Sequence, residues 1–300
     1  IFFQIISEYT NMSQNNIKDQ VKKNFEKSAS TYDQYAILQH EVGKRLIDRL
    51  DPININPETI LDIGSGTGFT SEKLLNKYKK AKFFLTDIAC NMLKASKIRN
   101  NLDNIFHINS DMEYLPFQDN SIDLIFANLS FQWSFDLKQT ISECHRILKP
   151  NGLLIFTTLG TSTLWELRTS WHKVNPNYHH TNKFLDMHNL GDGLMKSEFS
   201  SPILETKNIT LTYSKMIDIF HDLKNIGANT IVDNNQRKKS LLGKTEFQNI
   251  QQEYEKYKVN NKFPASYEII YAHTWKLPAK DKPKSKYPEV SETLVPVDVL

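Results

Sequence analysis

The residues of this chain best suited to bind a small ligand form a glycine-rich segment, L-D-I-G-S-G-T-G-F-T, at residues 61–70. Its glycines stand at alternate positions between an apolar run and a helical pattern. Glycine suits backbone with a positive φ, or a ligand that touches the main chain. The spacing differs from the G-x-G-x-x-G of pyrophosphate binders, and Asp62 adds a negative charge that favours an ammonium group over a phosphate. The residues expected around such a ligand are Asp62, Gly64, Ser65, Gly66 and Gly68.

Polar residues also follow the next three apolar runs of the chain. Asp87 ends the second run, 19 positions after Gly68, near the spacing of a carboxylate that binds ribose hydroxyls. Asp111 follows the third run and Asn128 ends the fourth. Each of these residues, like Asp62, could instead cap a helix or end a strand. Their order along the chain favours one binding site at the carboxyl ends of neighbouring strands.

The elements that would position these residues alternate between strand-like runs and helical patterns. This rhythm predicts a parallel sheet with helices on both faces. Two further strands are expected at 203–213 and 266–275, with helices at 214–226 and 245–258 between them. The expected fold class is therefore α/β and Rossmann-like, with a mostly parallel seven-stranded sheet. The first five runs lie at 59–61, 83–86, 105–108, 122–127 and 152–158.

Composition changes along the chain suggest its organisation. Residues 161–200 are rich in Trp, His, Asn and Leu, and they predict short helices that cover the mouth of the ligand site. A Lys/Pro-rich stretch from residue 276 predicts disorder. The expected segments are an N-terminal extension at 1–12, an N-terminal helical segment at 13–57, a nucleotide-binding core at 58–160, a helical lid at 161–200, the C-terminal part of the same domain at 201–277 and a disordered tail at 278–300.

Charge and cysteine content exclude several classes of protein. The chain has 37 basic and 34 acidic residues, a formal net charge of +3, which does not indicate a nucleic-acid binder. Two cysteines, Cys90 and Cys144, do not make a disulfide framework, so a reducing, cytoplasmic setting is expected. No apolar run is long enough to span a bilayer, so no membrane association is expected. Four histidines between residues 172 and 188 lack acidic or cysteine partners at ligand spacing, so no metal is expected.

The glycine loop and the ordered polar residues together resemble the class I methyltransferases that use S-adenosylmethionine (SAM). SAM carries an α-amino group and a sulfonium but no phosphate, which agrees with the charge of Asp62. The resemblance implies that Asp87 binds the ribose, that Asp111 meets the adenine amino group and that Met112 packs on the ring. The cofactor-binding residues so implied are Asp62, Gly64, Ser65, Gly66, Gly68, Asp87, Ile88, Asp111, Met112, Asn128 and Leu129.

Blocks outside this core are more specific. They read F-E-K-S-A-S-T-Y-D-Q-Y-A-I-L-Q at 25–39, N-L-S-F-Q-W at 128–133, D-L-K-N-I-G-A-N at 222–229 and F-P-A-S-Y-E at 263–268. This series resembles the malonyl-[acyl-carrier protein] O-methyltransferase family of early biotin synthesis, over about residues 18–277. The resemblance implies that the acceptor is the free carboxylate of a malonyl thioester on the phosphopantetheine arm of acyl-carrier protein. That carboxylate is already ionised at pH 7, so catalysis needs positioning and exclusion of water rather than a general base.

Three residues are the candidates for contact with the acceptor. Tyr32 could hydrogen-bond the carboxylate or line the methyl pocket, and it could equally be a core tyrosine. Arg168 or Lys183 could neutralise the carboxylate, and either could be an ordinary surface charge. Lys183 stands where the family suggests Arg, and lysine offers a point charge instead of a bidentate clamp. Two basic clusters could dock an acidic carrier protein or be solvated faces: Lys18, Lys22, Lys23 and Lys27, and Arg237, Lys238, Lys239 and Lys244.

Other classes share parts of these patterns. The SAM-fold assembly factor of respiratory complex I, which hydroxylates a protein arginine, shares T-L-x-E-L-R at 163–168 and a late P-A-x-Y block. The L-K-x-I-G-A block and the lack of an Arg/Ser-rich presequence favour the biotin enzyme. Quinone-type C-methyltransferases share the core without needing the C-terminal blocks. A nucleic-acid amino methyltransferase would carry N/D-P-P-Y/F where this chain has N-L-S-F at 128–131. A non-catalytic module would be expected to lack Asp87 or a loop glycine.

Overall fold

The computed structural model describes residues 14–176, 182, 184–230 and 243–278. Its strands are β1 (Thr59–Ile63), β2 (Lys82–Asp87), β3 (Ile105–Asn109), β4 (Ile122–Ala127), β5 (Leu148–Leu159), β6 (Phe199–Tyr213) and β7 (Phe263–Lys276). Its α-helices are α1 (Gln14–Ser28), α2 (Tyr32–Tyr35), α3 (Ile37–Asp48), α4 (Phe69–Lys77), α5 (Cys90–Arg99), α6 (Leu137–Ile147), α7 (Trp165–Val174), α8 (Met187–Lys196), α9 (Met216–Asn225) and α10 (Lys244–Tyr254).

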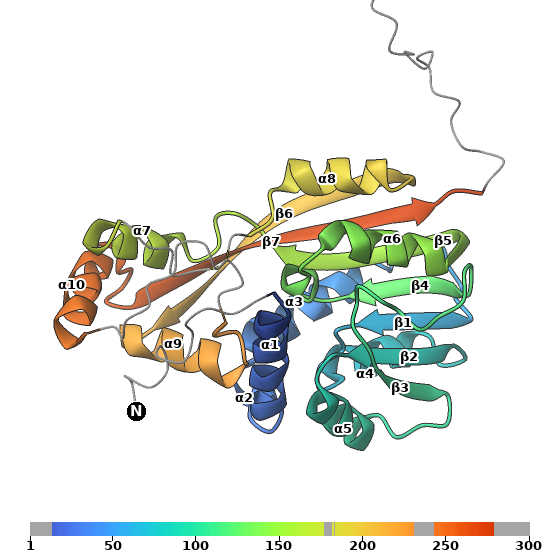
Figure 1. The fold of residues 1–300 in the computed structure, drawn as a ribbon, viewed down its shortest axis with the longest axis horizontal. Helices are drawn as coiled ribbons and strands as arrows, with labels where there is room; N and C mark the ends of the chain where they lie inside the picture. Colours follow the sequence, from blue (N-terminus) through green and yellow to red (C-terminus); the bar gives the residue numbers. More distant parts are fainter. Residues whose placement is uncertain (1–13, 177–181, 183, 231–242, 279–300) are drawn as a thin grey trace, which may run out of the picture.

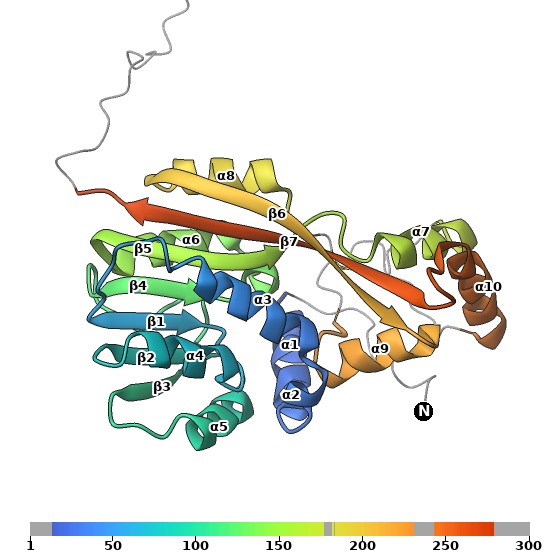
Figure 2. The same ribbon diagram turned by 180° about the vertical axis from the view of Figure 1, so that it is seen from behind.

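The strands form a seven-stranded sheet in the order β3-β2-β1-β4-β5-β7-β6. β7 runs antiparallel to both of its neighbours, and the other pairs are parallel. Helices lie against both faces of this sheet, and α1 and α2 stand between it and α9 (Figures 1 and 2). The predicted α/β, Rossmann-like class with a mostly parallel seven-stranded sheet is therefore confirmed.

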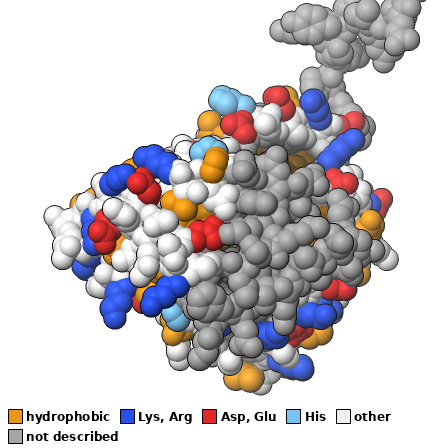
Figure 3. Space-filling model, turned by 60° about the vertical axis from the view of Figure 1, so that its left-hand side comes forward, with side chains coloured by type: hydrophobic (Ala, Val, Ile, Leu, Met, Phe, Trp, Pro, Cys, Tyr) orange, Lys and Arg blue, Asp and Glu red, His pale blue; other side chains and the backbone are white. Residues whose placement is uncertain are grey.

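The surface carries both signs of charge, in keeping with the small net charge. Figure 3 shows the side of the molecule where α7, α9 and α10 come forward, and basic and acidic side chains are interspersed on its described part. No helix among the described residues is long and apolar enough to cross a membrane. Residues 1–12 and nearly all of the expected tail lie outside the described residues.

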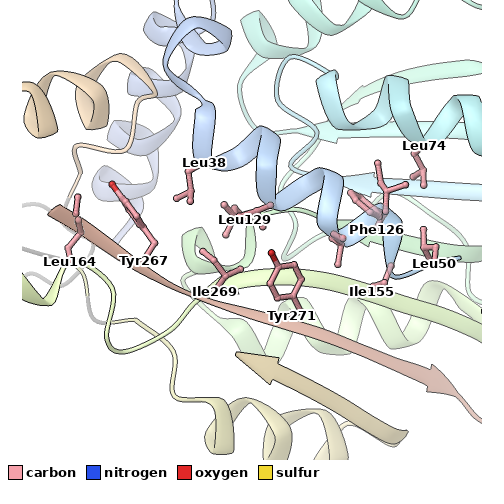
Figure 4. Packing of buried hydrophobic residues seen from close by; sticks show 14 of the residues in the cluster. Leu38, Leu50, Leu74, Phe126, Leu129, Ile155, Leu164, Tyr267, Ile269 and Tyr271 are labelled. Carbon is pink, nitrogen blue, oxygen red and sulfur yellow. The ribbon is translucent and has the colours of Figure 1, made fainter. Parts of the chain in front are cut away.

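The central strands of the sheet are buried on both faces, which explains their continuous apolar runs. Successive residues of β4 point to opposite faces, so Phe126 packs in one core cluster and Ile125 in the other. Figure 4 shows the first cluster, where Phe126, Leu74 and Leu50 pack between the sheet and the helices beside it. The core therefore fixes the strands in register and brings their carboxyl ends to one edge.

Most observed strands extend the predicted ones by a few residues, whereas α9 and α10 are shorter than the helices expected at 214–226 and 245–258. The helical segment expected at 13–57 is divided into α1, α2 and α3, and residues 161–200 contain α7 and α8. The last strand begins at Phe263, three residues before the expected start, because its pairing with β6 continues to Tyr213. Edges of elements depend on such tertiary pairing, which short-range periodicity does not report.

One glycine of the loop sits where two helices meet. Gly68 has φ +76°, and a Cβ there would lie 2.3 Å from both Ser96 Oγ and Asn100 Nδ2. The Asn100 side chain also donates to Gly68 O at 3.0 Å. A side chain at this position would therefore force α4 away from α5.

We expect Gly68→Ala to lower the free energy of unfolding by about 1–3 kcal/mol, because alanine disfavours a positive φ and its methyl group has no room. The matched control is Gly191→Ala in α8, where the nearest atom to a Cβ is Leu204 Cδ1 at 3.7 Å. That change should raise the free energy by up to about 1 kcal/mol. Urea unfolding measures both variants, and equal effects would contradict this account of the loop.

Candidate functional site

A cavity of about 1280 Å³, counting its open mouth, lies at the carboxyl ends of the parallel strands. Side chains of α1, among them Val21 and Phe25, line it opposite the strand ends. The Phe25 ring meets Trp133 edge-on at 5.3 Å, which closes one side. The predicted site residues that line this cavity are Tyr32, Gly64, Gly66, Asp87, Ile88, Asp111, Met112, Asn128 and Leu129.

The glycine loop is folded back onto β2. The N–H groups of Gly64 and Ser65 both donate to Thr86 O, at 2.8 and 2.9 Å, and Gly66 N–H donates to the Asp87 carboxylate at 3.0 Å. A phosphate-binding loop would instead direct such donors at its ligand. The loop therefore suits a ligand that needs close approach to the backbone but brings no phosphate.

Asp87 joins the loop, β2 and α5. Its carboxylate accepts from Gly66 N–H and, at 2.8 Å, from Ala89 N–H. Burial raises the pKa of Asp87 to about 6, although these backbone hydrogen bonds oppose the shift, and the charge of Glu26 adds to it. Asp87 thus both caps α5 and lines the cavity. Above about pH 6 its carboxylate is a negatively charged acceptor in the cavity wall.

Asp111 is paired with a residue of α1. Lys18 Nζ donates to Asp111 at 2.6 Å and to Glu113 at 2.7 Å, so this lysine of the predicted docking cluster is turned into the cavity wall. Ser110 Oγ beside them is buried and has no hydrogen-bond partner among the described residues. The Lys18 contacts fasten α1 over the end of β3 and leave Ser110 for a ligand.

Asp62 faces a smaller neighbouring cavity instead. Its side chain is 2% exposed and accepts a hydrogen bond from Ser71 at 2.5 Å. Burial raises the pKa of Asp62 to about 7, against the effect of Ser71, and the charge of Asp87 contributes. Ser65 and Gly64 line the same small cavity. Asp62 thus ties the loop to α4, and its role as an ammonium ligand stays a prediction.

Tyr32 lines both cavities and is held there by its neighbour. Asp33 accepts from Thr67 Oγ1 at 2.6 Å and pairs with Arg99 at 2.7 Å, which connects α2 to the loop and to α5. Burial alone would raise the pKa of Asp33, but the hydrogen bonds of His40 and Thr67 and the charge of Arg99 lower it to about 2. Burial and the negative charges of Asp87 and Asp33 raise the pKa of Tyr32, so its hydroxyl stays a neutral donor.

Asn128 and Leu129 directly follow β4 and lie opposite α3. Asn128 donates to Gln39 O at 2.9 Å and accepts from Thr157 Oγ1 at 2.9 Å. Leu129 has φ +48°, and its N–H donates to Thr157 Oγ1 at 2.9 Å. These bonds hold the loop after β4 in place, so that the side chains after it face the cavity.

Neither predicted cation is among the described residues that line the cavity. Arg168 is not among the described residues that line it, since α7 packs on α10 and β7. Burial there lowers the pKa of Arg168, while the charge of Glu268 acts to raise it. Lys183 lies outside the described residues. Both roles stay predictions. The predicted lid helices α7 and α8 contribute no described lining residue, and α1 and α2 take that place.

The two docking clusters stay predictions as well. Lys23 and Lys27 are exposed on α1, while Lys18 is not available for docking. Most of the second cluster, residues 237–239, lies outside the described residues. No group of three metal-ligating side chains occurs within the ranges that the structure describes.

Several site residues were not predicted from sequence. Glu26 of α1 accepts from Cys90 N–H at 2.6 Å and Asn91 N–H at 2.8 Å, so α1 caps α5. A second group, at the α9 end of the cavity, includes Asp222 and Tyr213. The only sequence signal for it was the block at 222–229, which carries no chemistry by itself.

The chemistry of the cavity fits SAM. Two carboxyl groups, Asp87 and Asp111, line it at the strand ends, and Lys18 is the one cation among the described lining residues. Lys18 is already paired, and Gln39 Oε1 is a buried acceptor without a described partner. Such a lining suits a cationic ligand with hydroxyl and amino donors and disfavours phosphate.

Comparisons with known proteins agree with this fit. The methyltransferase-domain family matches residues 61–156, which include the glycine loop and the ends of β1 to β4. Among solved structures, the YcgJ protein of Bacillus subtilis is similar, with a TM-score of 0.56 and 14% identity over 80% of this chain and 99% of that one. A candidate methyltransferase of Bacillus halodurans C-125 also has a TM-score of 0.56, at 14% identity, over 79% and 99%. These two structures show the fold. The methyltransferase domain and the chemistry of the cavity together indicate that SAM is the cofactor of this chain.

Curated relatives are similar over nearly the whole chain. A malonyl-[acyl-carrier protein] O-methyltransferase of Methylovorus sp. (strain MP688) is 39% identical, over 88% of this chain and 90% of that protein. Proteins of the same name from Nitrosospira multiformis and Gallionella capsiferriformans are 38% and 40% identical, each over 86% of this chain and over 89% and 91% of their own lengths.

We expect SAM binding to weaken as pH falls through about 6, the pKa of Asp87. Only the ionised carboxylate accepts hydrogen bonds from ribose hydroxyls at full strength, so the Kd should rise about tenfold per pH unit below that value. Isothermal titration calorimetry between pH 5 and 8 measures this. Asp87→Asn should bind weakly at every pH, with the slope lost. A slope that persists in Asp87→Asn but disappears in Asp62→Asn would contradict the assignment.

Proposed function

Because this chain belongs to the malonyl-[acyl-carrier protein] O-methyltransferase family, we propose that it methylates the free carboxylate of a malonyl thioester on acyl-carrier protein. The product is the malonyl methyl ester that starts biotin synthesis. The observation that carries the proposal is the 39% identity over 88% of the chain, which extends well beyond the methyltransferase domain. The relatives reported above carry this name rather than that of an arginine-modifying assembly factor or a quinone enzyme. The free thiols of Cys90 and Cys144 agree with a cytoplasmic setting.

When bound, SAM would supply an electrophilic methyl group to the carboxylate oxygen of the acceptor. The residues proposed to hold SAM are Asp87 at the ribose and Asp111 with Met112 at the adenine, beside Gly64 and Gly66. A malonyl carboxylate is ionised at pH 7 and needs no base to activate it. This agrees with a cavity that has no histidine among its described lining residues.

Tyr32 is proposed to position the acceptor. Its hydroxyl is neutral over the whole working range, because burial and two negative neighbours raise its pKa. The Tyr32 ring lies against the loop, with its Cε1 atom 4.0 Å from where a Cβ of Gly66 would be. A neutral donor there can hydrogen-bond a carboxylate without repelling the cationic cofactor.

Exclusion of water is the second contribution of the chain. Val21, Phe25 and Trp133 form an apolar wall, and a carboxylate that loses its hydration is a stronger nucleophile. Lys18 is committed to Asp111 and Glu113, so the described lining offers no unpaired cation. Within the described lining, the charge left to balance the substrate carboxylate would be that of the bound sulfonium, and the roles of Arg168 and Lys183 stay predictions.

Intact-mass analysis of malonyl-carrier protein after incubation with the protein and SAM tests the proposal. We expect a gain of one methyl group, and no gain on acetyl-carrier protein, which has no free carboxylate. Tyr32→Phe should lower kcat/KM about 10- to 100-fold through the lost hydrogen bond. Tyr114→Phe, at a tyrosine that is 70% exposed, is the matched control and should change nothing. No methyl gain in a preparation that binds SAM would reject the substrate.

A further inference from the structure

The same cavity is also lined from the side of α9, away from the strand ends that carry the predicted cofactor residues. Its wall there comes from the end of β6, from α9 and from the start of β7, with Tyr213, Asp222 and Tyr267 as its polar members. α9 packs against the turn between α1 and α2, where Thr31 Oγ1 donates to Asn225 O at 3.2 Å. Figure 1 shows α9 on the opposite side of α1 and α2 from strands β1 to β3. We call this part the α9 channel.

The α9 channel is mostly apolar. Its remaining described lining residues are Leu159, Leu211, Leu223, Ile226 and Ala228.

One carboxyl group stands in this apolar wall. The Tyr213 hydroxyl hydrogen-bonds the Asp222 carboxylate, and burial raises the pKa of Asp222 despite that bond. In the same helix, the charge of Asp218 raises the pKa of Asp222 and that of His221 lowers it. A carboxylate is an acceptor at both oxygens, so a single hydrogen bond leaves lone pairs for a ligand donor.

These features select a ligand class. A ligand that fits this lining is largely apolar and carries an N–H or O–H donor for Asp222. A second carboxylate is disfavoured there by like-charge repulsion. A pantetheine arm, built of methylenes, a dimethyl carbon and two amides, meets each of these conditions.

We propose that the α9 channel binds the pantetheine arm of the thioester substrate, with Asp222 accepting a hydrogen bond from an arm amide and Tyr213 holding Asp222 in place. This proposal rests on the proposed function and extends it. It also gives the substrate a direction, because Asp222 keeps the malonyl carboxylate away and the arm places that carboxylate beside Tyr32. On the adjoining wall, burial and the charge of Asp222 raise the pKa of the Tyr267 hydroxyl.

The test compares two substrates that differ only in the arm. Malonyl-carrier protein has the full arm, and the S-ethyl thioester of malonic acid has the reacting carboxylate without any amide. Asp222→Leu should lower kcat/KM about 10- to 100-fold on the carrier protein and leave it unchanged on the S-ethyl thioester. Asp222→Asn keeps an acceptor oxygen and should retain most of the activity. Tyr213→Phe, which leaves Asp222 unfixed, should show a smaller loss confined to the carrier protein.

Controls separate this role from a structural one. Asp218→Leu is the matched control, since Asp218 is in the same helix but is not among the lining residues. The Kd for SAM should be unchanged in every variant. Equal losses on both substrates, no loss on the carrier protein, or equal kcat/KM of the natural protein on the two substrates would each overturn the proposal. A natural protein that binds SAM but methylates neither substrate would instead show that the proposed function is wrong.

Discussion

The site depends on the carboxylate of Asp87, which accepts hydrogen bonds from Gly66 N–H and Ala89 N–H. These two bonds join the end of β2 to the glycine loop on one side and to the start of α5 on the other. Because the loop donors are used inside the protein, the loop approaches a ligand through its lack of side chains rather than through free N–H groups. Burial of this carboxylate disfavours its charged form and raises the pKa of Asp87 to about 6. Hydroxyl donors and a cation of a ligand would stabilise the charged form.

The second constraint is the position of α1. Lys18 fastens it to the loop after β3, Glu26 caps α5, and Asn24 donates to Thr230 Oγ1 at 2.7 Å beyond α9. The same helix therefore covers the cofactor part of the cavity and borders the α9 channel. Its apolar residues, among them Phe25, exclude water from both parts. The proposed sites of the methyl acceptor and the cofactor thus share one N-terminal helix as a wall.

Local sequence signals predicted much of this arrangement. The apolar runs and turn residues located each strand, and the order of Asp87, Asp111 and Asn128 indicated the edge where a ligand binds. These signals are local, since strand periodicity and loop glycines are properties of a few neighbouring residues. The fold class followed from them, whereas the family followed from the resemblance of the blocks at 25–39, 128–133, 222–229 and 263–268.

Contacts between distant side chains could not be predicted in this way. Lys18 was assigned to a solvated or docking face, yet it pairs with Asp111, 93 positions away. Arg168 was a candidate for contact with the acceptor or an ordinary surface charge, and α7 packs on α10 so that Arg168 is not among the described lining residues; its role stays a prediction. The block at 222–229 contains Asp222 but did not indicate its role, because that role comes from the strands that meet α9 in space. Helical periodicity gives the face that packs and not the partner that it packs against.

The most direct measurement is a crystal structure of the protein with S-adenosylhomocysteine and a malonyl-pantetheine thioester. The account predicts the adenosine between Asp87 and Asp111, the malonyl carboxylate beside Tyr32, and an arm amide beside Asp222. A carboxylate found beside Asp222, or an adenosine that makes no contact with Asp87, would contradict it.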